Sequence, residues 1–308
     1  MTTSRKNEAA ALWTEALMRP DQRTLLESLA ADLAEYTGRP IDEVLADMAS
    51  AKDRFAARWC KDDPAAKGEE AVRAFYSEDL LEAYELAFWH GGGCGEPPLN
   101  YAAAAMMLRE NGASRVLDFG SGIGSGALVL AKAGLQPDIA DIARPLLGYA
   151  SARLQRRGIN HRAIDLNTEA VPSNTYNAVC CFDVLEHVQN PFRVVNQLAQ
   201  ALKVGGVLLC NLPGTDDGSR PMHITAFHDR TMFVLRTAVC RNHRAIKAAV
   251  ALGADFTVLR KRRFGRAWNR ILLTVLRLKR FVFRQPFGGE AYTTADLRDG
   301  PGRGTKQT

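Results

Sequence analysis

The chain has 308 residues, of which 46% are hydrophobic and 24% charged, and its formal net charge is +6. This globular composition excludes a wholly disordered or fibrous chain and allows one large domain with an additional subdomain. The six cysteines form no C-x-x-C pair, and we find neither a signal-peptide core nor a run of about 18 apolar residues. We therefore expect reduced thiols and a cytoplasmic protein that does not cross a membrane.

Charge is unevenly distributed along the chain. The first 100 residues hold 19 acidic and 11 basic side chains, so the basic excess lies in the remainder. Between Phe256 and Gly289 there is no acidic residue, whereas arginine and lysine are frequent. This asymmetry predicts an anionic partner for the C-terminal part.

Helical periodicity dominates the N-terminal part. Residues 8–90 are rich in Ala, Leu, Glu and Arg at helical spacing, and they predict an α-helical subdomain over 1–95. A glycine- and proline-rich segment, 90–100, separates it from a helix over 101–111.

Strands and helices then alternate. This order predicts an α/β fold in which a parallel sheet is covered by helices on both sides. We expect the domain to span 96–287 and the polar, glycine-rich segment 288–308 to be a flexible tail. Strands are predicted at 115–119, 137–141, 161–165, 176–183, 204–212 and within 254–265, and helices at 125–134, 144–157 and 191–202. The segment 280–285 is a candidate for the seventh strand, which would shorten the C-terminal helix.

A glycine-rich turn follows the first of these strands. Residues 116–126 read VLDFGSGIGSG. Glycines at this density let the backbone turn sharply and approach a ligand, and the following helix directs free N–H groups toward it. The turn predicts a cofactor loop, and the glycine pattern alone would also fit a dinucleotide.

An acidic residue extends this motif. With Asp118 the loop reads D-x-G-x-G-x-G, which resembles motif I of the class I S-adenosylmethionine-dependent methyltransferases. A carboxylate here suits the ammonium group of that cofactor, whereas it would repel a pyrophosphate. The resemblance implies a Rossmann-like, doubly wound, mostly parallel seven-stranded sheet. It also implies S-adenosylmethionine as the cofactor, bound by Asp118, Gly120, Ser121, Gly122 and Gly124.

Two further strands end in acids. Asp141 ends the second strand, where a carboxylate can accept hydrogen bonds from both ribose hydroxyls of an adenosine. The resemblance implies that Ile142 packs on the adenine. It also implies that Asp165 accepts a hydrogen bond from the adenine amino group and that the Leu166 backbone N–H donates to the ring.

The fourth strand runs into the sequence DVLEHV, which is frequent in the same family. If this turn is helical, Asp183, Glu186 and His187 share one face and converge on one ion or substrate. His187 is the candidate catalytic base, because imidazole titrates near neutral pH, and Asp183 and Glu186 are candidate partners in catalysis. Asp183 is also expected to contact the cofactor.

The same three residues could instead bind a divalent metal. The ubiquinone-biosynthesis O-methyltransferases, which this chain resembles, carry E-x-x-E-H here and use it for a metal, as do small-RNA 3′-end 2′-O-methyltransferases. In this chain Asp183 replaces the first glutamate, and a set of Asp183, Glu186 and His187 suits Mg, Mn or Zn. In many small-molecule methyltransferases the Glu-His pair only closes the loop by hydrogen bonds.

Two histidines follow the fifth strand. His223 and His228 lie in a segment that resembles the substrate-side loop of these enzymes. Either could contact the acceptor or complete a metal site, and either could equally cap the next helix.

The sequence after residue 265 predicts a basic amphipathic helix. Its apolar residues follow helical spacing, and its arginines lie largely on another face. Such a helix could contact an anionic membrane surface, bind RNA phosphates, or pack on the sheet with its arginines in water.

Together these motifs predict an S-adenosylmethionine-dependent methyltransferase that acts on an oxygen, rather than a nitrogen, of a small or lipophilic metabolite. An RNA 2′-O-methyltransferase and a non-catalytic S-adenosylmethionine-binding module are the alternatives. We expect the N-terminal helices to cover the crevice as a lid, because small acceptors require water to be excluded from the reacting methyl group.

Overall fold

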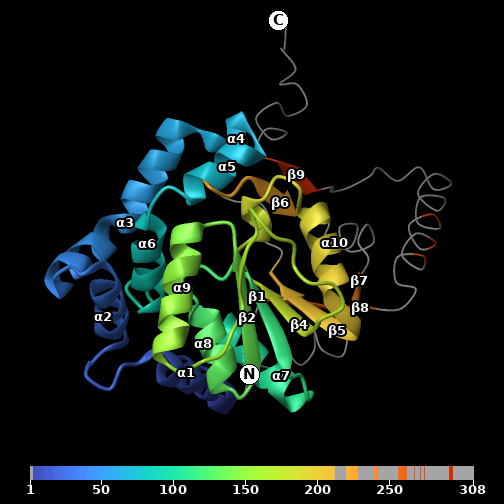
Figure 1. The fold of residues 1–308 in the computed structure, drawn as a ribbon, viewed down its shortest axis with the longest axis horizontal. Coiled ribbons are helices and arrows are strands. Elements are labelled where there is room, and N and C mark those ends of the chain that lie inside the picture. Colours follow the sequence, from blue (N-terminus) through green and yellow to red (C-terminus); the bar gives the residue numbers. More distant parts are fainter. Residues whose placement is uncertain are drawn as a thin grey trace, which may run out of the picture.

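The computed structural model describes residues 3–211, 220–227, 239–241, 256–261 and 291–293, together with positions 267, 271 and 274. A seven-stranded sheet lies at the centre of these residues, in the order β3-β2-β1-β4-β5-β8-β7 (Figure 1). The first five strands of this order are parallel, and β8 is antiparallel to both β5 and β7. The predicted mostly parallel, seven-stranded sheet is confirmed. The strands are β1 (Arg115–Phe119), β2 (Gln136–Asp141), β3 (Ala163–Asp165), β4 (Tyr176–Cys181), β5 (Leu202–Cys210), β7 (Val239–Arg241) and β8 (Thr257–Lys261).

Helices cover both faces of this sheet. They are α7 (Asn100–Glu110), α8 (Ser125–Lys132) and α9 (Arg144–Arg156), with α10 (Pro191–Ala201) opposite. Figure 1 shows α8 and α9 on one side of the strands and α10 on the other. Successive strand residues point to opposite faces, so in β4 Cys180 packs with α7 and α8, whereas Val179 and Cys181 pack with α10. Apolar residues at successive positions are therefore required by burial of both faces.

The N-terminal helices pack onto the same domain. They are α1 (Thr3–Leu17), α2 (Leu25–Thr37), α3 (Ile41–Asp62), α4 (Pro64–Lys67), α5 (Glu69–Tyr76) and α6 (Leu81–His90). Trp13 of α1 shares a hydrophobic cluster with α7 and α8. Helices α2, α3, α5 and α6 share another cluster with Ile123 of the glycine loop and Tyr149 of α9. The N-terminal region and the sheet thus share their cores, and the boundary near residue 95 stays a prediction.

Local signals set the ends of α2. The Thr24 hydroxyl accepts a hydrogen bond from the Glu27 backbone N–H at 3.1 Å, and the Glu27 carboxylate accepts one from the Thr24 N–H at 2.9 Å. This capping box satisfies backbone donors at the helix start. The helix ends at Gly38, whose φ of 69° is left-handed.

The C-terminal predictions have mixed outcomes. The predicted sixth strand is β8, and the seventh strand of the described sheet is β7; the segment 280–285 lies outside the described residues. The predicted amphipathic helix also lies outside them, apart from positions 267, 271 and 274. In the predicted tail, only Ala291–Thr293 is described. It forms β9, which pairs antiparallel with β6 (Thr225–Phe227).

A helix that spans a membrane must be both long and apolar, and the helices in the described part of the chain do not meet this requirement.

Gly126→Ala tests how tightly Tyr101 packs on the start of α8. A Cβ at residue 126 would lie 2.1 Å from Tyr101 Cε1, so the ring would have to move. Overpacking of this kind costs roughly 1–3 kcal/mol, whereas the helix-propensity gain of alanine over glycine is about 1 kcal/mol at most. We expect a lower free energy of unfolding in urea titration.

Gly148→Ala in α9 is the matched control. The nearest atom to its added Cβ is the Tyr36 hydroxyl oxygen, at 3.1 Å, and this side chain is exposed and free to shift. We expect this variant to be as stable as the wild type or slightly more stable. Equal stability of the two variants would contradict tight packing at Gly126.

Candidate active site

The glycine loop joins β1 to α8 in a left-handed backbone. Gly120, Gly122 and Gly124 have φ angles of 70°, 51° and 75°. At Gly120 the reason for glycine is steric as well, because a Cβ there would lie 2.3 Å from Val184 Cγ2. The Gly120 N–H donates to the Ala140 carbonyl at 2.8 Å, which ties the loop to β2.

Asp118 lies behind this loop and is fully buried. Its Oδ1 accepts a hydrogen bond from the Tyr101 hydroxyl at 3.0 Å, whereas its buried Oδ2 has no hydrogen-bond partner among the described residues. Burial raises the pKa of Asp118 to about 7, although the Tyr101 hydrogen bond favours the carboxylate. A nearby cation would stabilise the ionised form of this buried carboxyl group.

Asp141 ends β2 beside the loop. Its Oδ2 accepts from the Gly122 N–H at 2.8 Å and its Oδ1 from the Ala143 N–H at 2.9 Å. Burial raises its pKa, while these backbone donors oppose the shift. Each oxygen retains a lone pair, so the carboxylate can still accept hydrogen bonds from a ribose diol.

At the end of β3, Leu166 and Asp165 form hydrogen bonds within the protein. The Leu166 N–H donates to the Asp141 carbonyl at 3.0 Å, because it continues the parallel pairing of β2 and β3. The expectation that this N–H donates to the adenine ring is therefore wrong for this conformation. Asp165 pairs with Arg144, with Nε 2.7 Å from Oδ2, and its Oδ1 accepts from Asn167. The pKa of Asp165 is low: burial would raise it, but these partners outweigh that effect.

A cavity of about 330 Å³ opens at this edge of the sheet. Its walls include His187 and several of the predicted cofactor residues: Gly120, Ser121, Gly122, Asp141, Ile142, Leu166 and Asp183. The walls do not include Asp118, Gly124, Asp165, Glu186 or His223. The carboxyl ends of β1, β2 and β4 thus meet at one cavity, as expected for ligands in open α/β sheets.

The DVLEHV turn is not an α-helix. Asp183 has a φ of 54°, and the single 3-10 turn η1 covers only Leu185–His187. Asp183 therefore does not share a helical face with Glu186 and His187, contrary to the conditional expectation from the sequence. Its Oδ1 accepts from Asn211 Nδ2 at 2.6 Å, and its N–H donates to Asn211 Oδ1 at 2.8 Å. Burial nevertheless raises the pKa of Asp183.

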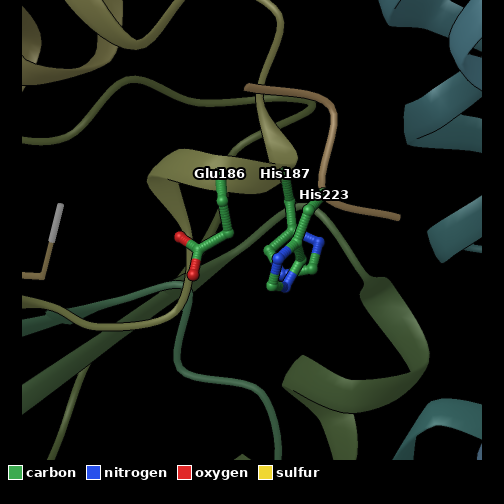
Figure 2. Close-up of side chains that lie close together, drawn as sticks. All are labelled: Glu186, His187 and His223. Atoms are coloured by element: carbon green, nitrogen blue, oxygen red, sulfur yellow. The ribbon is translucent and has the colours of Figure 1, made fainter. Parts of the chain in front are cut away.

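His223 lies next to His187 instead. Their ring centroids are 4.9 Å apart and the rings are nearly perpendicular, while Glu186 extends from the same turn as His187 (Figure 2). The Ile224 N–H donates to the Glu186 carbonyl at 2.8 Å, and this backbone contact holds the loop in place. Potential ligand atoms of Glu186, His187 and His223 lie within 4.8 Å of one another. His228 lies outside the described residues.

Tyr76 is the side-chain partner of His187. Its hydroxyl lies 3.1 Å from His187 Nδ1, and it comes from α5. Burial, with smaller contributions from His223 and Arg220, lowers the pKa of His187 to about 3. His187 is therefore neutral across the physiological pH range.

The sequence motifs missed the residues that α5 and α6 bring to the cavity. These are Glu69, Val72, Arg73, Tyr76, Glu82, Leu86, Trp89 and His90. Glu82 is notable because burial and the neighbouring Asp141 raise its pKa well above the usual range. The expectation that the N-terminal helices cover the crevice agrees with these positions, but helical spacing could not say which of their side chains would face the cavity, since that depends on how the helices dock.

Fold and site together define a class. A doubly wound sheet of order β3-β2-β1-β4-β5-β8-β7 with an antiparallel β8, a glycine loop after β1 and a carboxylate at the end of β2 is the arrangement of the class I S-adenosylmethionine-dependent methyltransferase fold. A family model described as a methyltransferase domain matches residues 92–259, and the chain belongs to this family. The enzyme class expected from the sequence is confirmed.

Relatives of known function are similar over part of the chain. The ubiquinone biosynthesis O-methyltransferase of Xanthomonas campestris pv. campestris is 30% identical over 143 residues, which is 42% of this chain and 57% of the relative. The enzyme of that name from Coxiella burnetii is 28% identical over 142 residues, 42% of this chain and 59% of the relative. The aligned part thus spans little more than half of each relative.

Solved structures are similar over comparable lengths. The StiE O-MT (residues 961–1257) covers 58% of this chain and 79% of its own, with 16% identity and a TM-score of 0.40. S-adenosylmethionine-bound CalS10, an amino pentose methyltransferase from Micromonospora echinaspora, covers 39% and 52%, with 25% identity and a TM-score of 0.34. These likenesses are partial, and neither bears on the acceptor.

The residues present fit the cofactor of this family. The left-handed glycines leave the cavity wall free of side chains at Gly120 and Gly122. The buried Asp118 Oδ2 without a partner suits the neighbourhood of an ammonium group, and Asp141 suits a ribose. The two arginines on the described wall, Arg73 and Arg193, pair with Glu69.

Ionisation of Asp118 should be coupled to cofactor binding. Its pKa of about 7 belongs to the free protein, and a bound ammonium group lowers it by favouring the carboxylate. Below about pH 7 binding must release a proton, so affinity should rise with pH, at most tenfold per unit, and level off above about pH 7. Calorimetry with S-adenosylhomocysteine from about pH 5.5 to 8.5, in buffers of different ionisation enthalpy, measures both affinity and proton release.

Asp118→Asn is the control, because it keeps an acceptor for Tyr101 but cannot ionise. It should bind more weakly than the wild type at about pH 8, with an affinity that depends much less on pH. An affinity of the wild type that is independent of pH would contradict the coupling.

Proposed function

We propose that this protein transfers a methyl group from S-adenosylmethionine to an oxygen of a small or lipophilic acceptor. The observation that carries the proposal is that His187 lies on the wall of the cavity that contains Gly120, Gly122 and Asp141. The similarity to ubiquinone biosynthesis O-methyltransferases supports oxygen as the acceptor atom.

His187 is the proposed proton acceptor. S-adenosylmethionine supplies a methyl group that its sulfonium already activates, so the protein's part is to orient the acceptor, exclude water and remove a proton. The His187 ring is also hydrogen-bonded to the Met222 backbone. For Nε2 to accept from the acceptor hydroxyl, the ring N–H must be on Nδ1, beside Tyr76. The proton moves to Nε2 as the new C–O bond forms. Even an imidazole with a pKa of about 3 is far more basic than the protonated ether that it deprotonates.

The N-terminal helices are proposed to exclude water from this reaction. Helices α5 and α6 contribute Tyr76, Leu86 and Trp89 to the cavity wall, which also includes the apolar Ile142 and Val184. The Ser77 hydroxyl donates to the Ile142 carbonyl at 2.9 Å, which fixes the end of α5 at the cofactor side. The aromatic and apolar side chains on this part of the wall favour an aromatic or lipophilic acceptor, and the carboxyl groups elsewhere on the wall disfavour an anionic one.

A divalent metal is the second candidate use of the His187 turn. The observation that favours it is the proximity of ligand atoms of Glu186, His187 and His223. Two imidazoles and a carboxylate suit Zn or Mn, and Asp183, which pairs with Asn211, would not take part. Such an ion would serve as a charge near the acceptor oxygen.

Replacing His187 should separate turnover from cofactor binding. We expect His187→Ala to lower kcat by 10²–10⁴-fold, roughly the contribution of a general base, and to change S-adenosylhomocysteine affinity less than threefold or so. Transfer of labelled methyl from the cofactor to quinol-like phenols, lipids and small RNAs identifies the acceptor and measures kcat. Labelling of the RNAs alone would contradict the proposal.

The pH profile supplies a check on the same residue. Because the pKa of His187 is about 3, its protonation should cause no loss of kcat between about pH 5 and 8. Tyr76→Phe removes the hydroxyl at Nδ1 and should lower kcat while S-adenosylhomocysteine affinity is kept. An inflection of kcat near pH 6.5 that disappears in His187→Gln would mean that the imidazole is solvated during turnover.

Metal removal tests the second candidate. If turnover needs an ion, dialysis against EDTA should abolish it, and Zn or Mn should restore it in the wild type but not in His223→Ala. Full activity after EDTA treatment, with no metal found by elemental analysis, would contradict the metal site and leave His187 as a proton acceptor that works without a metal.

A further inference from the structure

A buried ion pair joins the N-terminal helices to the sheet domain. Asp32 of α2 and Arg153 of α9 have side chains that are 1% and 0% exposed, and Arg153 Nε lies 2.9 Å from Asp32 Oδ2. Asp32 also accepts from Arg19 and Arg157. Burial opposes ionisation of Asp32, but the guanidinium groups outweigh it and lower its pKa. The pair is therefore charged at neutral pH.

Arg153 also holds the cofactor loop. Its Nη1 donates to the Ile123 carbonyl at 2.6 Å and to the Ser125 hydroxyl at 3.2 Å. Ile123 lies between Gly122 and Gly124, where the left-handed glycine backbone has many alternatives when it is not restrained.

Holding this carbonyl fixes a whole peptide plane. The Ile123 carbonyl and the Gly124 N–H belong to one planar unit, so the orientation of one sets that of the other. The Gly124 N–H donates to the Ser121 carbonyl at 2.8 Å and closes the turn over which Ser121 and Gly122 face the cavity. The guanidinium thus acts on the loop from its buried side.

The pair is poorly suited to a purely structural role. Arg153 Nη2 is buried and has no hydrogen-bond partner among the described residues. The cation also lies at the N-terminus of α8, where the helix dipole disfavours positive charge, and it depends on Asp32 for neutralisation. Apolar residues of similar size are often as stable as a buried ion pair, so stability alone does not explain it.

We propose that Arg153, held in place by Asp32, is the positioning residue of the cofactor loop. Helix α2 then belongs to the cofactor site, although it lies outside residues 92–259 that match the family and contributes no residue to the cavity wall. The proposal rests on cofactor binding and is independent of the acceptor.

The test compares affinity with stability in the full-length protein. In Asp32→Leu/Arg153→Met neither of the two fully buried charges is left without the other. Arg157 and Arg19 also lose Asp32, but their side chains are 22% and 25% exposed and can be solvated. We therefore expect the double variant to recover most of the stability that each single variant loses. Its affinity for S-adenosylhomocysteine should remain at least about tenfold below wild type, as expected when a charge-assisted hydrogen bond to the loop is lost. Denaturation midpoints and titration calorimetry provide the two quantities.

Two further variants make the result specific. Arg153→Lys keeps the charge but not the fork that reaches both Asp32 and the carbonyl, so its Gly124 amide should exchange hydrogen faster than in the wild type and its affinity should fall. Arg115→Met breaks another arginine–aspartate pair, 2.8 Å from Asp138, that has no contact with the loop, and its affinity should stay within about twofold of wild type.

Wild-type affinity in the stable double variant would overturn the positioning role and leave a structural ion pair. The same conclusion would follow if Arg153→Lys and Arg115→Met changed affinity equally. Failure of the wild type itself to bind S-adenosylhomocysteine would instead contradict the proposed function.

Discussion

The left-handed turn between β1 and α8 is the constraint on which the site depends. Its three glycines let the chain turn sharply from β1 into α8. Because they have no side chains, Val184 packs close to Gly120 and Leu86 packs close to Gly122. Every other part of the site is placed relative to this turn. Asp141 binds it from β2, Arg153 holds it from α9, and Tyr101 packs over its far end.

Electrostatically, the site is a group of carboxyl groups that burial keeps from ionising easily. Asp118, Asp141, Asp183 and Glu82 all have raised pKa values, and burial is the largest cause for each. A cationic cofactor relieves part of this cost, because it adds positive charge to what Arg220 and Arg58 supply near Asp183 and Glu82. The same carboxyl groups disfavour an anionic ligand group such as a pyrophosphate. Specificity for the cofactor therefore follows from desolvation as much as from direct hydrogen bonds.

The sequence predicted features that depend on residues close together in the chain, and it did not predict contacts between distant segments. The strand ends at Asp118, Asp141 and Asp183 were predictable, since a parallel sheet brings such ends together once each strand is recognised. The proximity of His223 to His187 requires the path of the chain after β5, and the approach of Tyr76 requires the docking of α5. The Leu166 prediction failed because a ladder hydrogen bond already uses its N–H, and no local pattern reports that competition.

The position of β8 in the sheet has a consequence for biosynthesis. This strand lies between β5 and β7, yet it is the last of the three to be made. Until residue 261 has left the ribosome, the edge of β5 is unpaired and β7 has no neighbour in the sheet. A nascent chain that already contains the whole glycine loop is therefore still open to wrong pairing along β5. About 50 residues must be synthesised between the end of β5 and the end of β8. Because parts of a chain fold in the order of synthesis, correct folding requires that the exposed edge of β5 does not aggregate during that time.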